Sequence, residues 1–562
     1  METDRVRALI EQGESLNTEF KRGAAGKLND TELVEAVVCM ANGDGGVLLI
    51  GVEDDGRVTG AAPRHGDRTD PRKIDALIAG RTVPLLQTRT CVVAIDERAV
   101  IVVEVPKSRR VVGTASGVYL RRTLQIDGSP QCLPFPAHEM LAHEIDRGAL
   151  DFATLPARDA TMDDLDPKEF DRFRHMAGTS GGDTVVSNLS DIEVCRSLGV
   201  WRTADDGVAR PTLGAVLLFG TETAIARHIP NHEAAFQLFD GLAMEVNSFS
   251  RAPLLRAAQE LFERVSSWNR EEELQFGMLR VSIPTVPTVV SREAIANALV
   301  HRDYTAMGPV RVTINDDSFE VTSPGGFPPG VRLDNLLTVS QPRSPILADA
   351  FRRAGIVERS GRGISLMFAS LLRLGRDAPD YSRSSDRFVR AVVPLGHADM
   401  ALARVVLERE ETTGRPMNLF DLQVLHELRS QTKLSAVEIA DQLHRTQGEV
   451  RAGLSRMIES GLVELRGSGR GRTYHLSASV YRALDNPPAY VRVRGTDPIQ
   501  QRRMVLQYVD SYGSITRSQA ADLCMITSQQ ASTLLRRMAA DGELAREGER
   551  KASKYVVPPG KL

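Results

Sequence analysis

Three polar residues recur at helical spacing in the segment SREAIANALVHRDY, residues 291–304. Glu293, Asn297 and His301 are each four residues apart, so on a helix they stack along one face. A carboxylate can orient a water molecule as a general base, and an amide oxygen can bind Mg²⁺. The stripe therefore predicts either a site or a satisfied buried network that also includes Asp303.

Two glycine-rich turns downstream could complete such a site. One strand ends in Thr-Ser-Pro-Gly-Gly, which contains Ser323, Gly325 and Gly326, and a helix begins near Gly361 and Gly363. Glycines at a helix N-terminus let backbone N–H groups approach a phosphate. A Glu-x-x-x-Asn helix, a strand ending in Gly-Gly and a Gly-x-Gly helix start, in this order, indicate a nucleotide site better than any one alone.

Carboxylates flank two strands near the start of the chain. Glu14 and Glu19 lie around the start of the strand TEFKR, and Asp54, with Glu53 as its rival, ends the strand GGVLLIGVED. If these strands are neighbours, three carboxylates converge near Lys21, which requires a cation or hydrogen bonds. Such a cluster could hold Mn²⁺ or Mg²⁺ for phosphodiester hydrolysis. The structural alternative is a local ion pair at Glu19 and an ordinary turn at Asp54.

Cations gather in three places where they could contact a phosphate backbone. Two sets lie at the tips of predicted hairpins near the end of the chain: Arg466, Arg470 and Arg472, and then Arg546, Arg550, Lys551 and Lys554. The third set lies in the N-terminal part: Lys107, Arg109, Arg110, Arg121 and Arg122.

The elements that must position these residues divide the chain into five segments. Residues 1–145 read as α/β, with Asp30 as the N-cap of a helix; 146–209 read as a helical linker; 210–397 form a second α/β unit, in which PTLGAVLLFG is a predicted strand. Residues 400–482 and 496–562 each read as three helices followed by a hairpin, so the tail contains an internal repeat. In both units a turn separates two helices at helix-turn-helix spacing, with caps at Ser435 and Thr516.

Composition limits the classes of protein. With 562 residues the chain is too long for one core, and its net charge of −3 leaves nucleic-acid binding to local patches. The five cysteines are odd in number and lack a C-x-x-C pair, which argues against a disulfide framework or zinc site and for a reducing compartment. We find no apolar stretch of about 18 residues, so we expect a cytoplasmic protein without a membrane span.

The tail units resemble the winged helix-turn-helix family, which implies that each hairpin lies against the DNA backbone while the second helix enters the major groove. Such units also serve as protein-contact modules. The segments EAIANALVHRDY, SPGGFPPGV and GIVERSGRGI resemble the divergent GHKL ATPase domain of bacterial RecG-like or Schlafen-like regulators.

The GHKL resemblance implies specific roles. Glu293 is the ATPase base, Asn297 binds Mg²⁺, Gly325 and Gly326 line the adenine side, and Gly361 and Gly363 belong to the phosphate lid. The family's adenine-binding Asp is absent, and Ser323 stands in that region.

GESLNTEFKR and ANGDGGVLLIGVEDD resemble the Schlafen core, an Alba-like (AlbA_2) domain. In nuclease-active members an acidic triad cuts RNA, and the matching positions are Glu14, Glu19 and Asp54.

The order of Schlafen core, GHKL-like sandwich and two winged helices resembles that of predicted bacterial transcriptional regulators. It implies a cytoplasmic, homo-oligomeric regulator that binds double-stranded DNA and responds to ATP and Mg²⁺. The alternative is a nucleotide-gated, metal-dependent nuclease acting on RNA or DNA, in defence or stress response. A third reading is a catalytically silent scaffold that oligomerises through the GHKL-like region.

Overall fold

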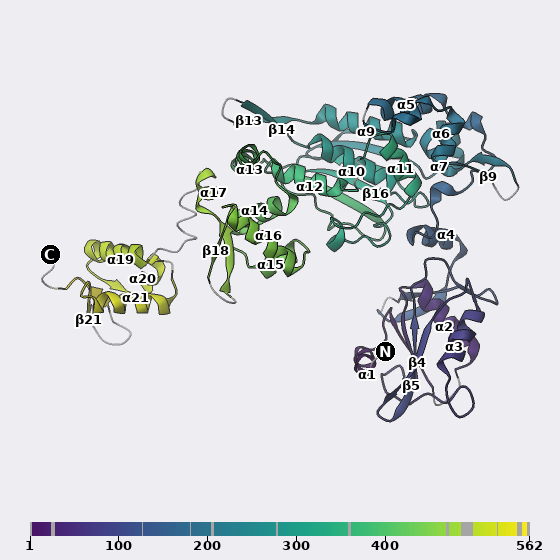
Figure 1. Ribbon diagram of the computed structural model, residues 1–562, viewed down its shortest axis with the longest axis horizontal. Coiled ribbons are helices and arrows are strands. Elements are labelled where there is room, and N and C mark those ends of the chain that lie inside the picture. The colour runs from purple at the N-terminus through teal and green to yellow at the C-terminus, as the bar shows by residue number, and fades with distance from the viewer. Residues whose placement is uncertain are drawn as a thin grey trace.

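The computed structural model describes residues 3–23, 28–125, 128–179, 181–203, 207–276, 279–357, 361–467, 471–484, 498–524, 526–547 and 554–558. Figure 1 shows an N-terminal α/β unit, a central unit built on a five-stranded sheet, and two smaller, mainly helical units that follow toward the C-terminus.

The N-terminal sheet has the strand order β1-β2-β5-β4, with β1 parallel to β2 and the other pairs antiparallel. Its main elements are α1 (Thr3–Gln12), β1 (Thr18–Lys21), α2 (Asp30–Asn42), β2 (Gly46–Ile50), α3 (Pro71–Gly80), β4 (Arg89–Ile95) and β5 (Arg98–Val105). Side chains alternate between the two faces of a strand, so each face builds its own core. Leu48 packs with α2 on one face, whereas Leu49 packs with Phe20 and with Val6 of α1 on the other.

Helix α2 is capped one residue before the predicted position. The Asn29 side chain accepts from the backbone N–H of Glu32, and the Glu32 carboxylate accepts from the N–H of Asn29. Asp30 is instead the first helical residue, and its carboxylate pairs with Arg64 at 2.7 Å. Asn and Asp cap helices about equally well, so capping preference alone does not separate these two neighbouring positions.

A hairpin of β7 (Leu120–Leu124) and β8 (Pro130–Pro134) lies against the end of α2. The Asn42 amide donates to the carbonyl oxygens of Val112 (2.7 Å) and Leu120 (2.8 Å). Cys39 of α2 forms a disulfide with Cys132 of β8. The odd cysteine count argued against a disulfide framework, and this disulfide corrects that expectation. Pairing depends on which cysteines lie close together in the fold. The remaining elements of this unit are β3 (Thr82–Val83), β6 (Gly113–Thr114) and α4 (Ala137–Asp146).

The segment predicted as a helical linker, 146–209, packs into the core of the central unit. Phe170 and Phe173 pack on Phe219, the first with ring centroids 4.1 Å apart, in the same core cluster as the central sheet. The predicted strand PTLGAVLLFG is mostly helix α7, because a short apolar run shows no period that separates strand from helix. The elements are η1 (Phe152–Thr154), η2 (Met162–Asp164), α5 (Pro167–Thr179), η3 (Thr184–Asn188), α6 (Asp191–Ser197), β9 (Trp201–Thr203), β10 (Ala209–Pro211), α7 (Leu213–Phe219) and α8 (Glu222–His228).

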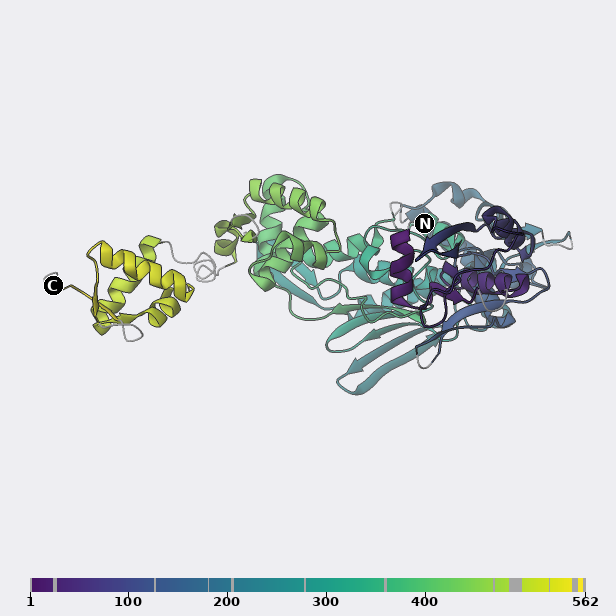
Figure 2. The same cartoon turned by 90° about the horizontal axis from the view of Figure 1, so that it is seen from below.

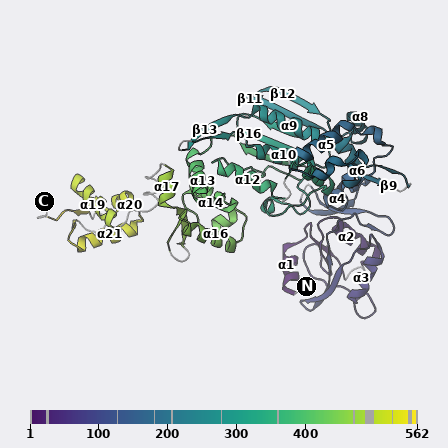
Figure 3. The same ribbon diagram turned by 45° about the horizontal axis from the view of Figure 1, so that its top comes forward.

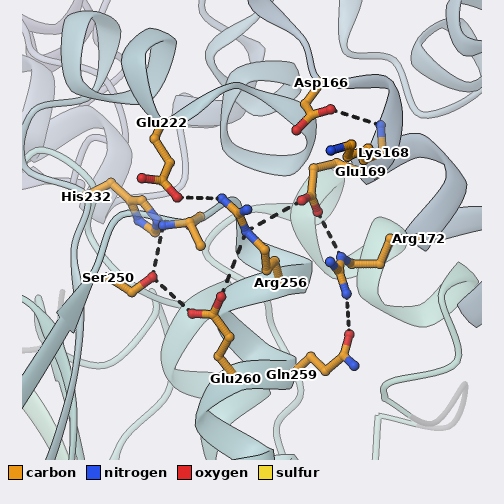
Figure 4. Close-up of polar contacts among 11 residues, drawn as sticks. Asp166, Lys168, Glu169, Arg172, Glu222, His232, Ser250, Arg256, Gln259 and Glu260 are labelled. Atoms are coloured by element: carbon orange, nitrogen blue, oxygen red, sulfur yellow. Dashed lines mark hydrogen bonds and ion pairs between the residues drawn. The ribbon is translucent and has the colours of Figure 1, made fainter.

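An ion network fastens this segment to the central unit (Figure 4). The buried Glu169 of α5 pairs with Arg172 at 3.0 Å and with Arg256 at 3.5 Å. Arg256 also pairs with Glu222 at 2.8 Å and with Glu260 at 3.9 Å. Burial raises the pKa of Glu169, and the two arginines oppose that shift. A buried carboxylate with two cationic partners is tolerated, so the network fixes α5 against the helix that carries Arg256.

The central sheet has the order β12-β11-β15-β16-β17, with β11 and β15 parallel and the other neighbours antiparallel. Its strands are β11 (Ala234–Asp240), β12 (Ala243–Ser250), β15 (Val310–Ile314), β16 (Ser318–Pro324) and β17 (Phe388–Pro394). Figure 3 shows α9 (Leu254–Trp268) and α10 (Thr288–Val300) lying along this sheet, and α12 (Gly363–Arg373) packs beside α10. The other elements are β13 (Glu271–Phe276), β14 (Leu279–Pro284), η4 (Leu333–Asn335) and α11 (Pro345–Arg353).

The tail forms two separate cores, one for each predicted unit. Figure 2 shows the two units following one another along the long axis, in green and yellow. The first contains α13 (Met400–Thr413), α14 (Leu419–Gln431), α15 (Ala436–Gln442), α16 (Gln447–Glu459), β18 (Val463–Arg466), β19 (Thr473–Leu476) and α17 (Ala478–Ala483). The second contains α19 (Pro498–Tyr512), β20 (Ile515–Thr516), α20 (Arg517–Cys524), α21 (Ser528–Ala540), β21 (Ala545–Glu547) and β22 (Lys554–Val556).

The same capping pattern occurs in both units. Ser435 and Thr446 cap α15 and α16 through reciprocal bonds with a Glu three residues later. Thr516 and Thr527 do the same before α20 and α21, with Gln as the partner. Each pair of caps is eleven residues apart, so both units set the same distance between the starts of their two helices. The predicted caps at Ser435 and Thr516 are confirmed.

Candidate functional site

Helix α10 turns its polar stripe toward a cavity of about 620 Å³ lined by residues of α10, α12, β16 and β17. Five of the residues predicted for a nucleotide site line it: Glu293, Asn297, Ser323, Gly361 and Gly363. His301 lines it too. The cavity has the size of a small-molecule site, and it gathers segments that are far apart in the sequence.

Glu293 lies against the first residue of α12. Its side chain is buried, and a Cβ at Gly363 would overlap Oε2 of Glu293. The carboxylate thus faces the positive end of the α12 helix dipole. Burial and the charge of Glu293 raise the pKa of Tyr381, which also lines the cavity. The position where we expected a phosphate is therefore next to a carboxylate of the chain itself.

Asn297 and Ser323 offer complementary groups to the cavity. The amide nitrogen of Asn297 is buried and has no hydrogen-bond partner among the described residues. The Ser323 hydroxyl donates to the carbonyl oxygen of Ala298 at 2.7 Å, so the oxygen keeps lone pairs that can accept. A donor and an acceptor on one side of a cavity suit a ligand edge that carries both, such as that of a nucleobase.

His301 is neutral in this wall. Its Nδ1 accepts from the backbone N–H of Arg343 at 3.3 Å. Burial lowers the pKa of His301 to about 4, and the charge of Arg343 adds to the shift. The imidazole therefore helps to position the loop that carries Arg343.

Arg302 and Asp303, which follow the stripe, anchor the turn after α10. The fully buried guanidinium of Arg302 donates to the carbonyl oxygens of Asn231, Asp303, Ala306 and Gly308 and stacks on Tyr304. Burial lowers the pKa of this arginine. The Asp303 carboxylate accepts from the N–H and the hydroxyl of Thr305. Both residues bond to the backbone around the end of α10, so they fix that end of the helix.

Gly325 and Gly326 do not line the described cavity, which corrects the predicted adenine-side role. A Cβ at Gly325 would lie 2.6 Å from the Cβ of Asp303, and one at Gly326 would lie 3.1 Å from the backbone of Asp386. The Gly326 carbonyl accepts from Arg343 at 2.7 Å. Both glycines permit the close approach of β16 to its neighbours, and Gly325 also has a positive φ of 93°.

The rest of the cavity combines apolar side chains with two arginines. Phe327, Leu336 and Ile364 line it, as do Arg352 and Arg362. An apolar surface with cations nearby suits a planar, anionic ligand such as a nucleotide. The sequence did not reveal these five residues, because they lie on separate loops and helices that only the fold brings together. Three of them could have been indicated by their motifs: Phe327, directly after the Gly-Gly turn, and Arg362 and Ile364, beside Gly361 and Gly363.

The N-terminal carboxylates Glu14 and Glu19 are neighbours, but a cation of the chain neutralises them. Oε1 of Glu14 accepts from the N–H of Phe20 at 2.8 Å. Burial raises the pKa of Glu14, the Phe20 bond opposes this, and the charge of Glu19 adds to it. The Glu19 carboxylate is bound by Arg122 and by Lys21. The position we assigned to a divalent cation is therefore next to a guanidinium.

Asp54 does not join that pair. It lies beyond the end of β2 on an exposed turn, where its carboxylate lies 3.5 Å from Arg22, and Glu53 pairs with the same arginine at 2.9 Å. Throughout the described ranges, no group of three His, Cys, Asp or Glu side chains could hold a metal ion. The expected convergence of three carboxylates is wrong, because β1 and β2 are parallel and Asp54 follows the far end of β2.

The predicted cations of the N-terminal unit differ in exposure. Arg109 and Arg110 are exposed, and Lys107 pairs with Asp44 at 2.6 Å. Arg121 pairs with Glu139 and stacks on Phe135. Arg122 is buried, with 1% of its side chain exposed, so the prediction that it contacts a phosphate backbone is wrong.

The hairpins of the tail present cations to solvent where the structure describes them. Arg472 and Lys554 are exposed, Lys554 lies 3.6 Å from Glu547, and Arg466 pairs with Glu464 at 3.2 Å. Arg546 is exposed as well. Three predicted cations lie outside the described residues: Arg470, Arg550 and Lys551.

The second helix of each capped pair in the tail has one buried and one exposed face. In α16 the buried residues include Val450, Leu454 and Met457, and in α21 they include Leu535 and Met538. The exposed faces carry polar and cationic residues that the sequence analysis did not single out: Gln447, Arg451, Ser455 and Arg456 in α16, and Gln529, Thr533, Arg536 and Arg537 in α21. Their helical spacing in the sequence was the available signal.

Four family models match parts of the chain. Residues 14–127 match the family model of the Schlafen AlbA_2 domain. This protein contains a Schlafen AlbA_2 domain. Residues 308–392 match the family "ATP-dependent DNA helicase recG C-terminal", and residues 383–560 match "DNA glycosylase AlkZ-like". Residues 138–235 match a domain family of unknown function.

The protein is therefore a multidomain α/β protein with a Schlafen AlbA_2 domain, a RecG-like C-terminal domain and an AlkZ-like segment. The first two are typical of DNA-binding regulators. The RecG-like match includes β15, β16 and most of β17, the three consecutive strands at one edge of the central sheet.

One solved structure, the DIP2311 protein from Corynebacterium diphtheriae, is similar over 99% of this chain and 98% of its own, at 20% identity and a TM-score of 0.48. No curated protein matches the chain. Among the described residues no helix is long and apolar enough to span a membrane.

Proposed function

We propose that this Schlafen AlbA_2 protein is a DNA-binding transcriptional regulator whose two tail units are winged helix-turn-helix modules. The observation that carries the proposal is the duplicated arrangement of a capped helix pair and a cationic hairpin. In each unit the exposed face of the second helix, α16 or α21, is free of the module's core and can enter a major groove. The hairpin cations then contact the flanking phosphates.

The test is duplex DNA affinity as a function of salt. Replacing Arg472 and Lys554 by Glu should weaken binding and make it less dependent on salt, because each cation that no longer neutralises a phosphate lowers the slope by about 1. Arg383→Glu, at an exposed position outside the tail modules, is the control and should leave the slope unchanged. Equal affinity and slope in the double variant would refute the proposal. Light scattering of the same samples tests the expected homo-oligomer.

We further propose that the central cavity binds an adenine nucleotide with Mg²⁺. The unpartnered amide nitrogen of Asn297, the accepting oxygen of Ser323 and the nearby arginines support the fit. Asn297 would turn its amide oxygen to Mg²⁺, and Glu293 would hold a water molecule. The bound nucleotide would supply phosphate charge that competes with Glu293 for the N-terminus of α12. Such a ligand changes DNA affinity only by the difference between its affinities for two conformations.

Calorimetric titration with Mg-ATP, with and without duplex DNA, tests this. We expect binding in the wild type, a loss of binding in Asn297→Ala, and an ATP affinity that changes when DNA is present. The absence of a heat signal in the wild type would refute nucleotide binding. The salt experiment above would still decide DNA binding.

The alternative of a metal-dependent nuclease receives less support. It needs carboxylates gathered around a cation, whereas Arg122 lies beside Glu19 and Asp54 pairs with Arg22. Cleavage of RNA or DNA in the presence of Mn²⁺, abolished by Glu19→Ala, would reverse this preference.

A further inference from the structure

The disulfide Cys39–Cys132 lies beside Arg122, the arginine that pairs with Glu19. Cys132 of β8 is the direct cross-strand partner of Arg122 of β7. Residues opposite each other on a hairpin project from the same face, so Cys132 lies on the face that carries the buried guanidinium of Arg122 and that faces the body of the domain. The bond to Cys39 thus fastens to α2 the same hairpin that carries Arg122.

Arg122 joins the hairpin to the segment before and within β1. Its Nε donates to the carbonyl oxygen of Ser15 and its Nη2 to that of Thr18, both at 2.9 Å, and its Nη1 binds Glu19. The charge of Arg122 also lowers the pKa of Glu14, against the effect of burial. One side chain of the hairpin therefore neutralises the two neighbouring carboxylates.

Few other described bonds hold this part of the hairpin on α2. Asn42 donates to the Leu120 carbonyl at 2.8 Å, and a Cβ at Gly43 would lie 3.2 Å from the Cβ of Arg122, which shows a tight contact. The disulfide joins positions 93 residues apart, so it restricts motions that local bonds do not. Cys39 is buried, whereas Cys132 is partly exposed, so an external thiolate can reach the Cys132 side.

We infer that Cys39–Cys132 is a thiol-exchange site that controls whether Arg122 covers the Glu14–Glu19 carboxylate pair. The reaction partner is a dithiol, of the class found in thioredoxin-like proteins. Its thiolate attacks the sulfur of Cys132 and displaces Cys39 as a thiolate, which takes up a proton. Its second thiol then resolves the mixed disulfide, so the dithiol is oxidised to a disulfide while Cys39 and Cys132 become two thiols. The hairpin is then released, and Arg122 moves away from the carboxylates.

This inference is independent of the proposed DNA and nucleotide binding, because it concerns only the Schlafen AlbA_2 domain. It predicts a local change in the accessibility of two carboxylates. Full-length protein purified without reductant is first mapped for a Cys39–Cys132 peptide by mass spectrometry. Carboxyl labelling with a carbodiimide and an amine is then compared before and after treatment with dithiothreitol.

We expect several-fold more labelling of Glu14 and Glu19 after reduction, and unchanged labelling of Glu53, which pairs with Arg22 outside the hairpin. Hydrogen exchange should accelerate across 118–125 and 128–135, with no change in the core strands β4 and β5. Cys132→Ser should behave like the reduced protein without any reductant. Cys91→Ser, in β4 of the same domain, is the matched control and should still respond to dithiothreitol.

Three results would overturn the inference. The first is the absence of the Cys39–Cys132 linkage in protein purified without reductant. The second is equal labelling of Glu14 and Glu19 in the oxidised and reduced forms. The third is faster exchange throughout the domain, including β4 and β5, which would show that the bond stabilises the whole fold and does not act on the hairpin. Wild-type protein with and without reductant decides between them even if Cys132→Ser does not fold.

Discussion

The carboxylate of Glu293 lies directly against Gly363, at the first residue of α12, in the space that a side chain at position 363 would occupy. This contact joins the polar stripe of α10 to the helix whose N-terminus faces the cavity. The glycine is thus required by a close approach within the chain, whether or not a phosphate also binds there. A change at either residue therefore affects the packing of the other.

Gly363→Ala should lower the free energy of unfolding of the central unit by about 1–3 kcal/mol, because the new Cβ overlaps Oε2 of Glu293. Combining it with Glu293→Ala should cost less than the two single changes added together, since the smaller side chain leaves room. Urea unfolding measures both. Gly396→Ala, where no atom lies within 4 Å of the added carbon, is the control. Additive costs would show that the contact is not formed.

Arg302→Met should destabilise the central unit strongly. It leaves the carbonyl oxygens of Asn231, Ala306 and Gly308 without their donor, and each buried acceptor left unsatisfied costs roughly 1–3 kcal/mol. Arg302→Lys should not restore stability, because an ammonium cannot reproduce the planar fork. Chemical denaturation provides the measurement, with Arg311→Met on the exposed side of β15 as the control. A destabilisation no larger than that of the control would contradict this role.

The neutral His301 makes stability depend on pH. Its pKa is about 4 when folded and about 6.5 when unfolded, so below pH 6.5 the unfolded state binds more protons. Stability therefore falls as pH decreases from 6.5 to 4, and His301→Gln should remove up to about 1.4 kcal/mol per pH unit of that slope. His143 and His232, whose pKa values are also lowered to about 4, keep their own contributions to the slope of stability against pH. An unchanged slope in urea unfolding from pH 4 to 7 would show that His301 is not buried as a neutral group.

The exposed residues of α16 and α21 should determine sequence preference, and the hairpins should not. Arg451→Ala or Arg536→Ala should cost about 1–3 kcal/mol on the preferred duplex and relax the preference at one position. Arg472→Ala should weaken binding to all duplexes alike. Selection from a random DNA pool with each purified variant measures this. An unaltered preference in both helix variants would assign these faces to another partner.

Local signals predicted much of the fold. The stripe on α10, the strands around Gly325 and the repeated tail units are marked by the period of apolar residues and by caps at fixed spacing, and these depend only on nearby residues. The run at 213–219 has no such period, so it was assigned wrongly. The stripe also indicated the cavity, because three polar residues on one helix face require a shared environment.

The sequence by itself determined most of the helices and strands, where the tail repeats, and that Glu293, Asn297 and His301 share a face. Only the tertiary structure decided that Arg302 is an internal anchor, that Arg122 binds Glu19 where a cation was expected, and that Cys39 meets Cys132. The physical reason is the separation along the chain of the residues that interact. Helix and strand patterns arise from neighbours along the chain, whereas ion pairs, disulfides and cavity walls join residues that approach one another only after the chain has folded.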